Sequence, residues 1–139
     1  MDVEECRRRF AAADHAYLAT ADAAGTPHVV PVTFAVDGDA VVHVVDAKPK
    51  RTTNLRRLRN IAANPRVCFL ADRYDDDWAR LWWVRADAVA RVVESGPELD
   101  HAVRLLQARY ARYLTDVPAG PVLWAEVTRW TGWSAESPG

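Results

Sequence analysis

Long apolar runs are missing from this sequence, and none approaches the ~20 residues that a membrane-spanning helix needs. Residues 1–9 carry three acidic residues followed by three arginines and lack the apolar core of a signal peptide. Cysteine is scarce too, since Cys6 and Cys68 are the only two and lie far apart, without the spacing of metal ligands. We therefore expect a cytoplasmic protein with two reduced thiols, no disulfide and no membrane contact.

An excess of charge of either sign is also absent, because 18 basic and 19 acidic residues give a net charge of −1. This balance excludes a general attraction to nucleic acid or anionic membranes, so any binding of an anion must be local. Half of the 139 residues are hydrophobic and 27% are charged, which is typical of a globular protein. The length fits a single domain over residues 1–139.

Motifs for catalysis by side chains are missing as well. The four histidines show no short metal spacing, and there is no Gly-x-Ser-x-Gly sequence and no glycine-rich phosphate loop. Asp75, Asp76 and Asp77 are consecutive, so their side chains point in different directions and indicate a solvated loop. We predict no catalytic side chain and no metal ligand. Any reaction would then be carried out by a bound cofactor.

Hydrophobic periodicity and turn signals divide the chain into short strands and three helices. The helices are expected to start at a capping box of Asp2 and Glu5, at Thr52 or Thr53, and at a second capping box of Ser95 and Glu98, and to end near Asp14, Asn64 and Leu114. The strands are expected at 15–21, 29–36, 40–45, 66–71, 81–93 and 122–128, followed by an aromatic tail at 130–133. This order predicts a mainly β protein with α, built as an antiparallel barrel with peripheral helices.

The most distinctive feature is a basic segment without a single acidic residue between Asp46 and Asp72. Its cations are Lys48, Lys50, Arg51, Arg56, Arg57, Arg59 and Arg66. The first three lie between a strand end and a helix start, where free backbone amides favour a phosphate group. For Arg56, Arg57 and Arg59 the alternative is a solvated helix face. A nucleic-acid site is disfavoured because no aromatic residues are interleaved with the charges.

Two further features bear on binding. Pro31 interrupts an apolar strand, so the backbone of Val32 and Thr33 is expected to be available to a flat polar ring, unless Pro31 only marks an edge strand. Trp82 and Trp83 put large rings on both faces of one strand, which favours a homodimer that covers the second face. Trp130 and Trp133 either cap a ligand ring or pack on the partner.

Residues 17–20, 25–34, 46–51, 54–67, 77–85 and 130–133 together resemble a known family. The segments Tyr17-Leu18-Ala19-Thr20 and Gly25-Thr26-Pro27-His28 resemble the opening of the pyridoxamine 5′-phosphate oxidase-like split-barrel superfamily. The basic segment Lys48-Pro49-Lys50-Arg51 looks like the cofactor-phosphate region of this superfamily. Its combination with residues 77–85 and with Trp130-Thr131-Gly132-Trp133 is similar to an actinobacterial branch that is usually described as dependent on the deazaflavin coenzyme F-420. The resemblance covers nearly the whole chain.

The resemblance implies a six-stranded, Greek-key-like split barrel that dimerises and binds its cofactor at the subunit interface. It also implies a set of cofactor-binding residues: His28, Pro31, Val32, Thr33, Val45, Asp46, Lys48, Lys50, Arg51 and Trp133. Among these, the strand from His28 to Thr33 would line the ring and the basic residues would hold the phosphate.

This chain departs from the flavin-mononucleotide (FMN) oxidases of the superfamily, which carry an arginine where His28 falls and a lysine near Thr33. The departures argue against pyridoxamine phosphate oxidation. The resemblance therefore implies an oxidoreductase that transfers hydride from reduced F-420 to a small unsaturated or carbonyl-like molecule. The alternatives are an FMN-binding oxidoreductase of the same fold, or a non-catalytic cofactor-binding or heme-binding protein.

Overall fold

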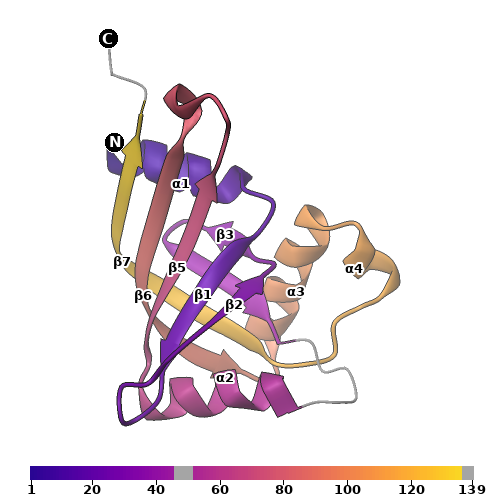
Figure 1. Ribbon diagram of the computed structural model, residues 1–139. Coiled ribbons are helices and arrows are strands. Elements are labelled where there is room, and N and C mark those ends of the chain that lie inside the picture. Colours follow the sequence, from indigo (N-terminus) through magenta and orange to yellow (C-terminus); the bar gives the residue numbers. More distant parts are fainter. Residues whose placement is uncertain (46–51, 136–139) are drawn as a thin grey trace.

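The computed structural model describes residues 1–45 and 52–135, without the side chains of 52–55. In these ranges the helices are α1 (Val3–Ala12), α2 (Thr52–Ala63), the 3-10 helix η1 (Trp78–Arg80), α3 (Pro97–Arg109) and α4 (Arg112–Thr115). The strands are β1 (Ala16–Ala21), β2 (Pro27–Val32), β3 (Ala35–Asp37), β4 (Ala40–Val44), β5 (Arg66–Arg73), β6 (Trp82–Val93) and β7 (Val122–Ser134). The molecule is mainly β with helices at its periphery, as predicted (Figure 1).

All seven described strands belong to one antiparallel sheet with the order β2-β1-β5-β6-β7-β4-β3. β2 and β3 form its two edges, so the sheet is open and the six-stranded barrel is not confirmed. The expected strand 29–36 is in fact two strands, since the chain leaves β2 after Val32 and starts β3 at Ala35. β2 then pairs with β1, and β3 pairs with β4 at the far edge.

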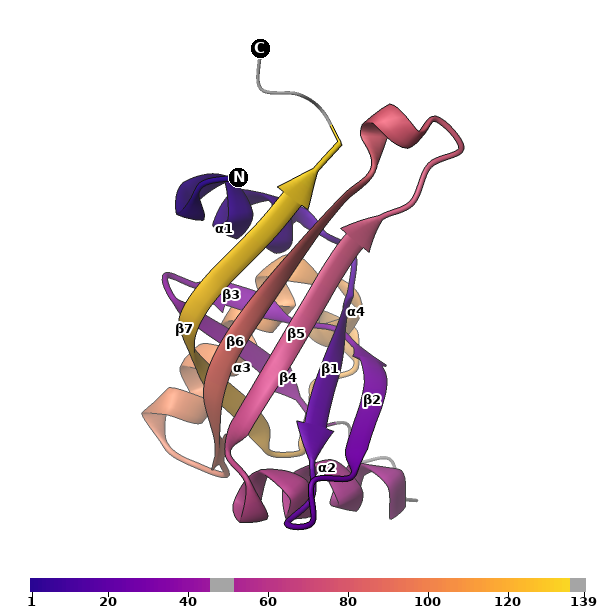
Figure 2. The same cartoon turned by 60° about the vertical axis from the view of Figure 1, so that its left-hand side comes forward.

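α1 packs across one face of the sheet and builds the main core (Figure 2). Asp2 caps the helix by accepting a hydrogen bond from Glu5 N at 2.8 Å, as the capping box predicts. The Phe10 ring lies 4.6 Å from Phe34 and 5.4 Å from Trp130. Residues 130–133 are therefore not a separate tail but part of β7, with Trp130 packed on the core. These residues form a strand because they pair with β6, although their mixed polarity does not predict one.

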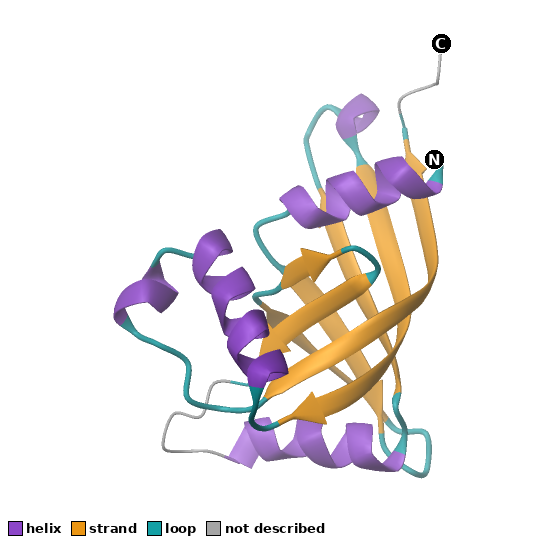
Figure 3. Cartoon of the chain, turned by 180° about the vertical axis from the view of Figure 1, so that it is seen from behind, coloured by secondary structure: helices purple, strands orange, loops and turns teal. Residues whose placement is uncertain are grey.

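α3 covers the β3–β4 end of the sheet and builds a second cluster that includes Val42, Leu106 and Trp124 (Figure 3). The capping box expected at its start is wrong, because Gly96 is the N-cap and no side chain caps the helix. Glu98 instead accepts two hydrogen bonds at 2.6 Å from Arg91 on β6. The tighter pairing with a fully charged guanidinium explains why Glu98 does not turn back to the helix start.

α2 lies across the lower end of the sheet in Figure 1. The buried Asn60 side chain donates a hydrogen bond of 3.0 Å to Thr20 on β1, and Ile61 enters the main core. These contacts fix the helix and bring its arginines beside β2 and β4. Among the described residues, no helix combines the length and apolar character needed to cross a membrane.

Candidate functional site

A histidine and an arginine from distant parts of the sequence meet where α2 approaches β4. His43 Nδ1 lies 2.9 Å from the Thr33 carbonyl oxygen, and Arg57 Nη1 lies 2.7 Å from His43 Nε2. Because arginine can only donate, Nε2 is the acceptor, and Nδ1 carries the proton and donates to Thr33. The imidazole is thus a neutral link between the backbone after β2 and a guanidinium on α2.

Electrostatics agree with the neutral state of His43. His43 is 4% exposed, and its burial, aided by the charge of Arg57, lowers its pKa to about 3. Arg57 is half-buried, and desolvation lowers the pKa of its guanidinium from its ordinary high value. Such a group remains a cation at neutral pH. The cluster therefore presents a positive charge in a partly dehydrated setting, where an anion is held more strongly than in water.

His28 is the second histidine at this place. It lies half-buried on β2, and its Nδ1 atom is buried without a hydrogen-bond partner among the described residues. Desolvation, followed by the charges of Arg56 and Arg57, lowers its pKa. A buried imidazole nitrogen without a partner is a point where a ligand can gain a hydrogen bond.

Two tyrosines extend the cluster toward α4. The Tyr113 hydroxyl lies 2.7 Å from Thr33 Oγ1. The Tyr110 hydroxyl accepts a hydrogen bond of 3.2 Å from Phe34 N and donates one of 2.9 Å to the Asp14 carbonyl oxygen. The β2–β3 junction is thereby tied to α3, α4 and the end of α1. Thr33 has both its carbonyl and its hydroxyl engaged within the protein.

The structure brings only part of the predicted binding set together. His28 and Thr33 belong to the His28–Thr33–His43–Arg57 group, hereafter the cationic cluster. Val32 and Val45 are buried in the core, and Val45 N donates to the Pro121 carbonyl at 2.8 Å. The remaining predicted positions, Asp46, Lys48, Lys50 and Arg51, lie outside the described residues.

Pro31 and Trp133 lie elsewhere on the molecule. Pro31 is exposed on the edge strand β2, as its interruption of an apolar strand predicts. Trp133 is 46% exposed near the end of β7, and three strands stand between β7 and β2 in the sheet order. His43 on β4 pairs with Leu123, which is ten residues before Trp133 on β7. Within one chain, Trp133 and the cationic cluster are therefore not neighbours.

Sequence reasoning missed His43, Arg57 and Tyr113 as a unit. The signal for His43 was its place in the apolar run 40–45, since a polar ring buried there needs partners for both nitrogens. Those partners come from residues 10 and 14 positions away, which no local pattern reveals. No group of three or more metal-ligating side chains occurs in the described part of the chain.

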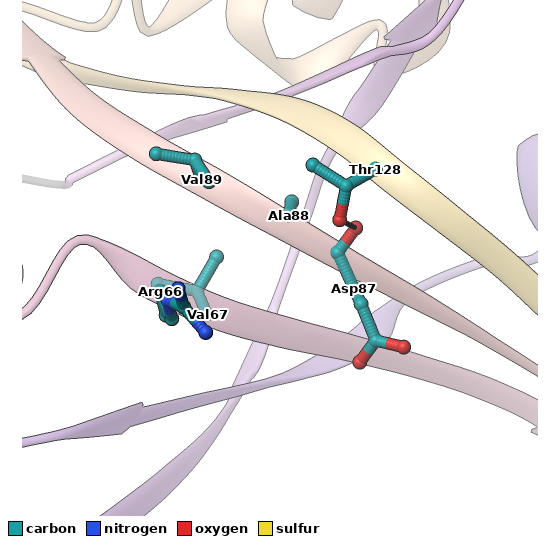
Figure 4. Close-up of a pocket in the computed structure, with 6 residues that line it drawn as sticks. All are labelled: Arg66, Val67, Asp87, Ala88, Val89 and Thr128. Atoms are coloured by element: carbon teal, nitrogen blue, oxygen red, sulfur yellow. Dashed lines mark hydrogen bonds between the residues drawn. The ribbon is translucent and has the colours of Figure 1, made fainter.

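A depression of about 410 Å³ lies on the outer face of the sheet, which points away from the core, at a β-bulge between β6 and β7 (Figure 4). It is lined by Arg66, Val67, Asp87, Ala88, Val89 and Thr128. Thr128 is the extra residue of the bulge, and its hydroxyl donates a hydrogen bond of 3.1 Å to the Asp87 carbonyl. Nearby, burial and the charge of Asp87 raise the pKa of the free Cys68 thiol to about 11, so Cys68 stays protonated.

A family model described as pyridoxamine 5′-phosphate oxidase matches residues 3–134. The chain belongs to this family. The match spans α1 to the end of β7 and includes every described element that builds the cationic cluster. None of the curated proteins matches the sequence.

Solved structures share the fold over nearly the whole chain. A conserved hypothetical protein from Mycobacterium tuberculosis has a TM-score of 0.74 at 23% identity, covering 97% of this chain and 86% of its own. A FAD-binding protein from Mesorhizobium loti has a TM-score of 0.74 at 18% identity, with 95% and 92% covered. HutZ, a heme storage protein from Vibrio cholerae, has a TM-score of 0.72 at 18% identity, with 96% and 95% covered. At these identities the similarity is one of fold.

Proposed function

We propose that this protein binds a flavin-type cofactor, with reduced coenzyme F-420 as the preferred one, and acts as an oxidoreductase. Its substrate would be a small unsaturated or carbonyl-like molecule that accepts a hydride. Membership of the pyridoxamine 5′-phosphate oxidase family and the fold shared with a FAD-binding protein support a flavin-type cofactor. The choice of F-420 rests on the sequence resemblance and on the replacement of an arginine by His28.

The observation that carries the proposal is the cationic cluster. Arg57 is half-buried and bonded to His43, and His28 Nδ1 is buried without a partner among the described residues. Desolvation, followed by the charges of Arg56 and Arg57, lowers the pKa of His28. Besides desolvation, the charges that lower the pKa values of His28 and His43 come from arginines, and no acidic residue contributes to either shift. This arrangement fits a cofactor with phosphate groups and polar ring edges, because it offers a cation and an unused nitrogen at one place.

Each residue has a distinct part in this arrangement. Arg57 would attract the anionic portion of the cofactor, together with Lys48, Lys50 and Arg51 of the preceding segment. His43 keeps the Arg57 guanidinium in one orientation by accepting its Nη1 hydrogen. His28 would bond a polar edge of the ring, and Val30, half-buried on the same face of β2, would contact its apolar surface and exclude water.

The bound cofactor would supply the hydride, and the protein would supply position and a water-poor environment. None of the described residues forms a nucleophile–base pair of the kind used in covalent catalysis. The side chains of His43 and Arg57 are already engaged with each other, so they hold rather than react. This division of labour is consistent with the absence of a catalytic motif in the sequence.

Heme is the alternative that one specific observation favours, since the unpartnered His28 nitrogen is a potential axial ligand and HutZ shares the fold. However, the charges around His28 come from arginines, which suit phosphate better than an apolar porphyrin face. Heme binding is therefore an outcome to be tested against the flavin proposal rather than the proposal itself.

The subunit arrangement is also part of the proposal. We infer a homodimer with the cofactor at its interface, because Trp83 and Trp133 pair on the face of the sheet that no described element covers. The dimer would bring Trp133 of one chain near the cationic cluster of the other. This would explain why the two do not meet within one chain.

Fluorescence titration of the purified protein with F-420, FMN and hemin tests the cofactor. We expect saturable binding of F-420 that is tighter than binding of FMN, and turnover of the reduced coenzyme with a panel of enones and quinones. Tight FMN binding without F-420 binding would overturn the choice of coenzyme. Binding of hemin alone would overturn the flavin-type proposal.

A further inference from the structure

One peptide unit between β2 and β3 is hydrogen-bonded through both of its polar groups. It joins Thr33 to Phe34, which belong to neither strand, so the hydrogen bonds of the sheet do not fix its orientation. Its carbonyl oxygen lies 2.9 Å from His43 Nδ1, and its N–H donates a hydrogen bond of 3.2 Å to the Tyr110 hydroxyl. The orientation of this peptide unit therefore depends on two side chains from distant parts of the chain.

Four successive hydrogen bonds run in one direction from Arg57 to the segment that follows α1. Arg57 donates to His43, and His43, protonated at Nδ1, donates to the Thr33 carbonyl. The N–H of the same peptide unit donates to Tyr110, whose hydroxyl donates in turn to the Asp14 carbonyl at 2.9 Å. Hydrogen bonds that share a direction polarise one another, so each strengthens the next. This series is called the donor chain below.

Tyr110 is held in the position that the donor chain needs. Its backbone N–H donates to the Leu106 carbonyl at 2.8 Å at the end of α3, and the Arg109 guanidinium lies over its ring, 5.0 Å from the centroid. Arg109 also donates to the Ala13 carbonyl, next to the carbonyl that accepts from Tyr110. Burial raises the pKa of the Tyr110 hydroxyl, so this group keeps its proton and remains a donor.

Tyr113 on α4 holds the same junction through a side branch. Its hydroxyl lies 2.7 Å from Thr33 Oγ1, and its ring meets that of Tyr110 edge-on with the centroids 5.8 Å apart. Two phenolic hydroxyls therefore restrain one short connection between strands. Tyr110 acts on the backbone N–H of Phe34, and Tyr113 acts on the side chain of Thr33.

From this arrangement we propose that Tyr110 is a positioning residue for the anionic part of the cofactor, acting on Arg57 through the Thr33–Phe34 peptide unit and His43. Tyr113 supports it. A guanidinium binds phosphate most strongly when its N–H groups already face the oxygens, so a fixed orientation lowers the cost of binding. The inference rests on the proposed function for the identity of the anion, whereas the donor chain itself does not depend on it.

Proton exchange at His43 Nδ1 tests the donor chain without any cofactor. In the native protein, ¹⁵N-resolved NMR spectra should show this imidazole protonated at Nδ1 alone, with a slowly exchanging proton. Tyr110→Phe should make that proton exchange with water about tenfold faster, because the peptide unit that accepts its hydrogen bond loses its anchor. Tyr17→Phe is the matched control, since it removes a hydroxyl that lies 3.3 Å from His15 Nε2, outside the donor chain.

Two further measurements separate positioning from general loosening. The backbone amides of β5 and β6 should exchange at the native rate in every variant. Tyr113→Phe leaves the Phe34 N–H paired, so it should accelerate exchange of the His43 proton only about threefold. This milder variant decides the test if Tyr110→Phe does not fold.

Cofactor affinity measures the consequence at Arg57. The F-420 dissociation constant should rise about fivefold in Tyr110→Phe and keep its native value in Tyr17→Phe. In an Arg57→Ala background, Tyr110→Phe should have no further effect, because its influence passes through the guanidinium.

Three results would overturn the proposal. They are a His43 proton that exchanges at the native rate in both tyrosine variants, an equal acceleration at the amides of β5 and β6, and an effect of Tyr110→Phe on F-420 binding that persists without Arg57. A native protein that binds no cofactor would instead overturn the proposed function, and the exchange rates would still decide whether Tyr110 holds His43 and Arg57 in place.

Discussion

A histidine inside an apolar strand needs partners for both ring nitrogens, and His43 shows how such a need organises a site. Its Nδ1 atom is satisfied by the Thr33 carbonyl and its Nε2 atom by Arg57. Removing either partner would leave a buried polar atom without a hydrogen bond, which costs about 1–3 kcal/mol. The same imidazole therefore supports the fold and holds the cation that we assign to the cofactor.

The neutral state of His43 predicts a stability change with pH. Its native pKa is about 3 and its unfolded value is near 6.5, so below pH 6.5 the unfolded chain takes up a proton that the native protein does not. The free energy of unfolding should fall by about 1 kcal/mol per pH unit between pH 6 and 5, with a smaller contribution of the same sign from His28.

Urea unfolding of the native protein and of His43→Gln at pH 5, 6 and 7 measures this slope. The lowered carboxylate pKa values are common to the two proteins, so their effect cancels in the comparison. An independent measurement is the NMR titration of the His43 ring, which should stay neutral down to pH 4. A ring that titrates near pH 6, together with equal slopes in the two proteins, would contradict the buried neutral imidazole.

The basic segment before α2 gives a prediction that rests on the sequence alone. Lys50→Ala and Arg51→Ala should each weaken cofactor binding by about 1–3 kcal/mol if each makes a charge-assisted bond to phosphate. Arg59→Ala is the matched control, because Arg59 is an exposed cation further along the same basic segment. Equal affinity of the double variant K50A/R51A and the native protein in fluorescence titration would rule out the assignment.

At the scale of elements, Gly132 on β7 permits the close approach of α1. A Cβ atom at this position would lie 2.6 Å from Met1 Sδ, 2.7 Å from Cys6 Sγ and 3.3 Å from Val84 Cγ2. Met1 is flexible, but Cys6 is buried and cannot move without shifting the helix. Gly132→Ala should therefore destabilise the protein by about 1–3 kcal/mol through overpacking.

A double-mutant cycle checks the cause. If the clash with Sγ matters, Gly132→Ala should cost less in a Cys6→Ala background than in the native protein, as measured by chemical unfolding. An equal loss of unfolding free energy in both backgrounds would mean that the clash with Cys6 Sγ does not cause the destabilisation.

Most elements could be predicted from the sequence because their signals are local. The capping box of Asp2, the turn at 37–39 and the periodicity of residues 52–63 each depend on neighbours within a few positions. The prediction errors arose where the structure depends on pairing between strands that are distant in the sequence. Residues 130–133 were expected to form an aromatic tail, but they are part of β7 because they pair with β6. The run 29–36 divides into two strands because its two halves pair with different neighbours.

The same distinction applies to the candidate site. His28 and Thr33 were predicted from the family resemblance as cofactor-binding residues. In the structure, the Thr33 carbonyl bonds His43, which bonds Arg57, and the charges of Arg56 and Arg57 lower the pKa of His28 after desolvation. The link from Thr33 through His43 to Arg57 was not predicted, since it joins β2, β4 and α2 across the fold. Arg57 had even been assigned to a solvated helix face as an alternative, whereas it is half-buried. Burial of a long cationic side chain depends on packing that no sequence pattern records.

At the scale of the whole molecule, the two faces of the open sheet carry different groups of residues. The inner face holds the core and, at its lower end, the cationic cluster with α2. The outer face, which points away from the core, holds exposed apolar side chains on three neighbouring strands, Tyr17, Val29 and Leu70. In the proposed homodimer, one chain would supply the anion-binding group and the second copy would bring Trp133 near it. Cofactor binding and dimerisation are then expected to strengthen each other.

Native mass spectrometry of the protein in an equimolar mixture of F-420, FMN, FAD and heme tests the central claim most directly. The account predicts a dimer that carries two molecules of a phosphorylated flavin-type cofactor, with F-420 dominant. The K50A/R51A variant should show a markedly smaller share of occupied dimer in the same spectrum. A protein that carries heme alone, or that binds none of the four compounds, would contradict the account.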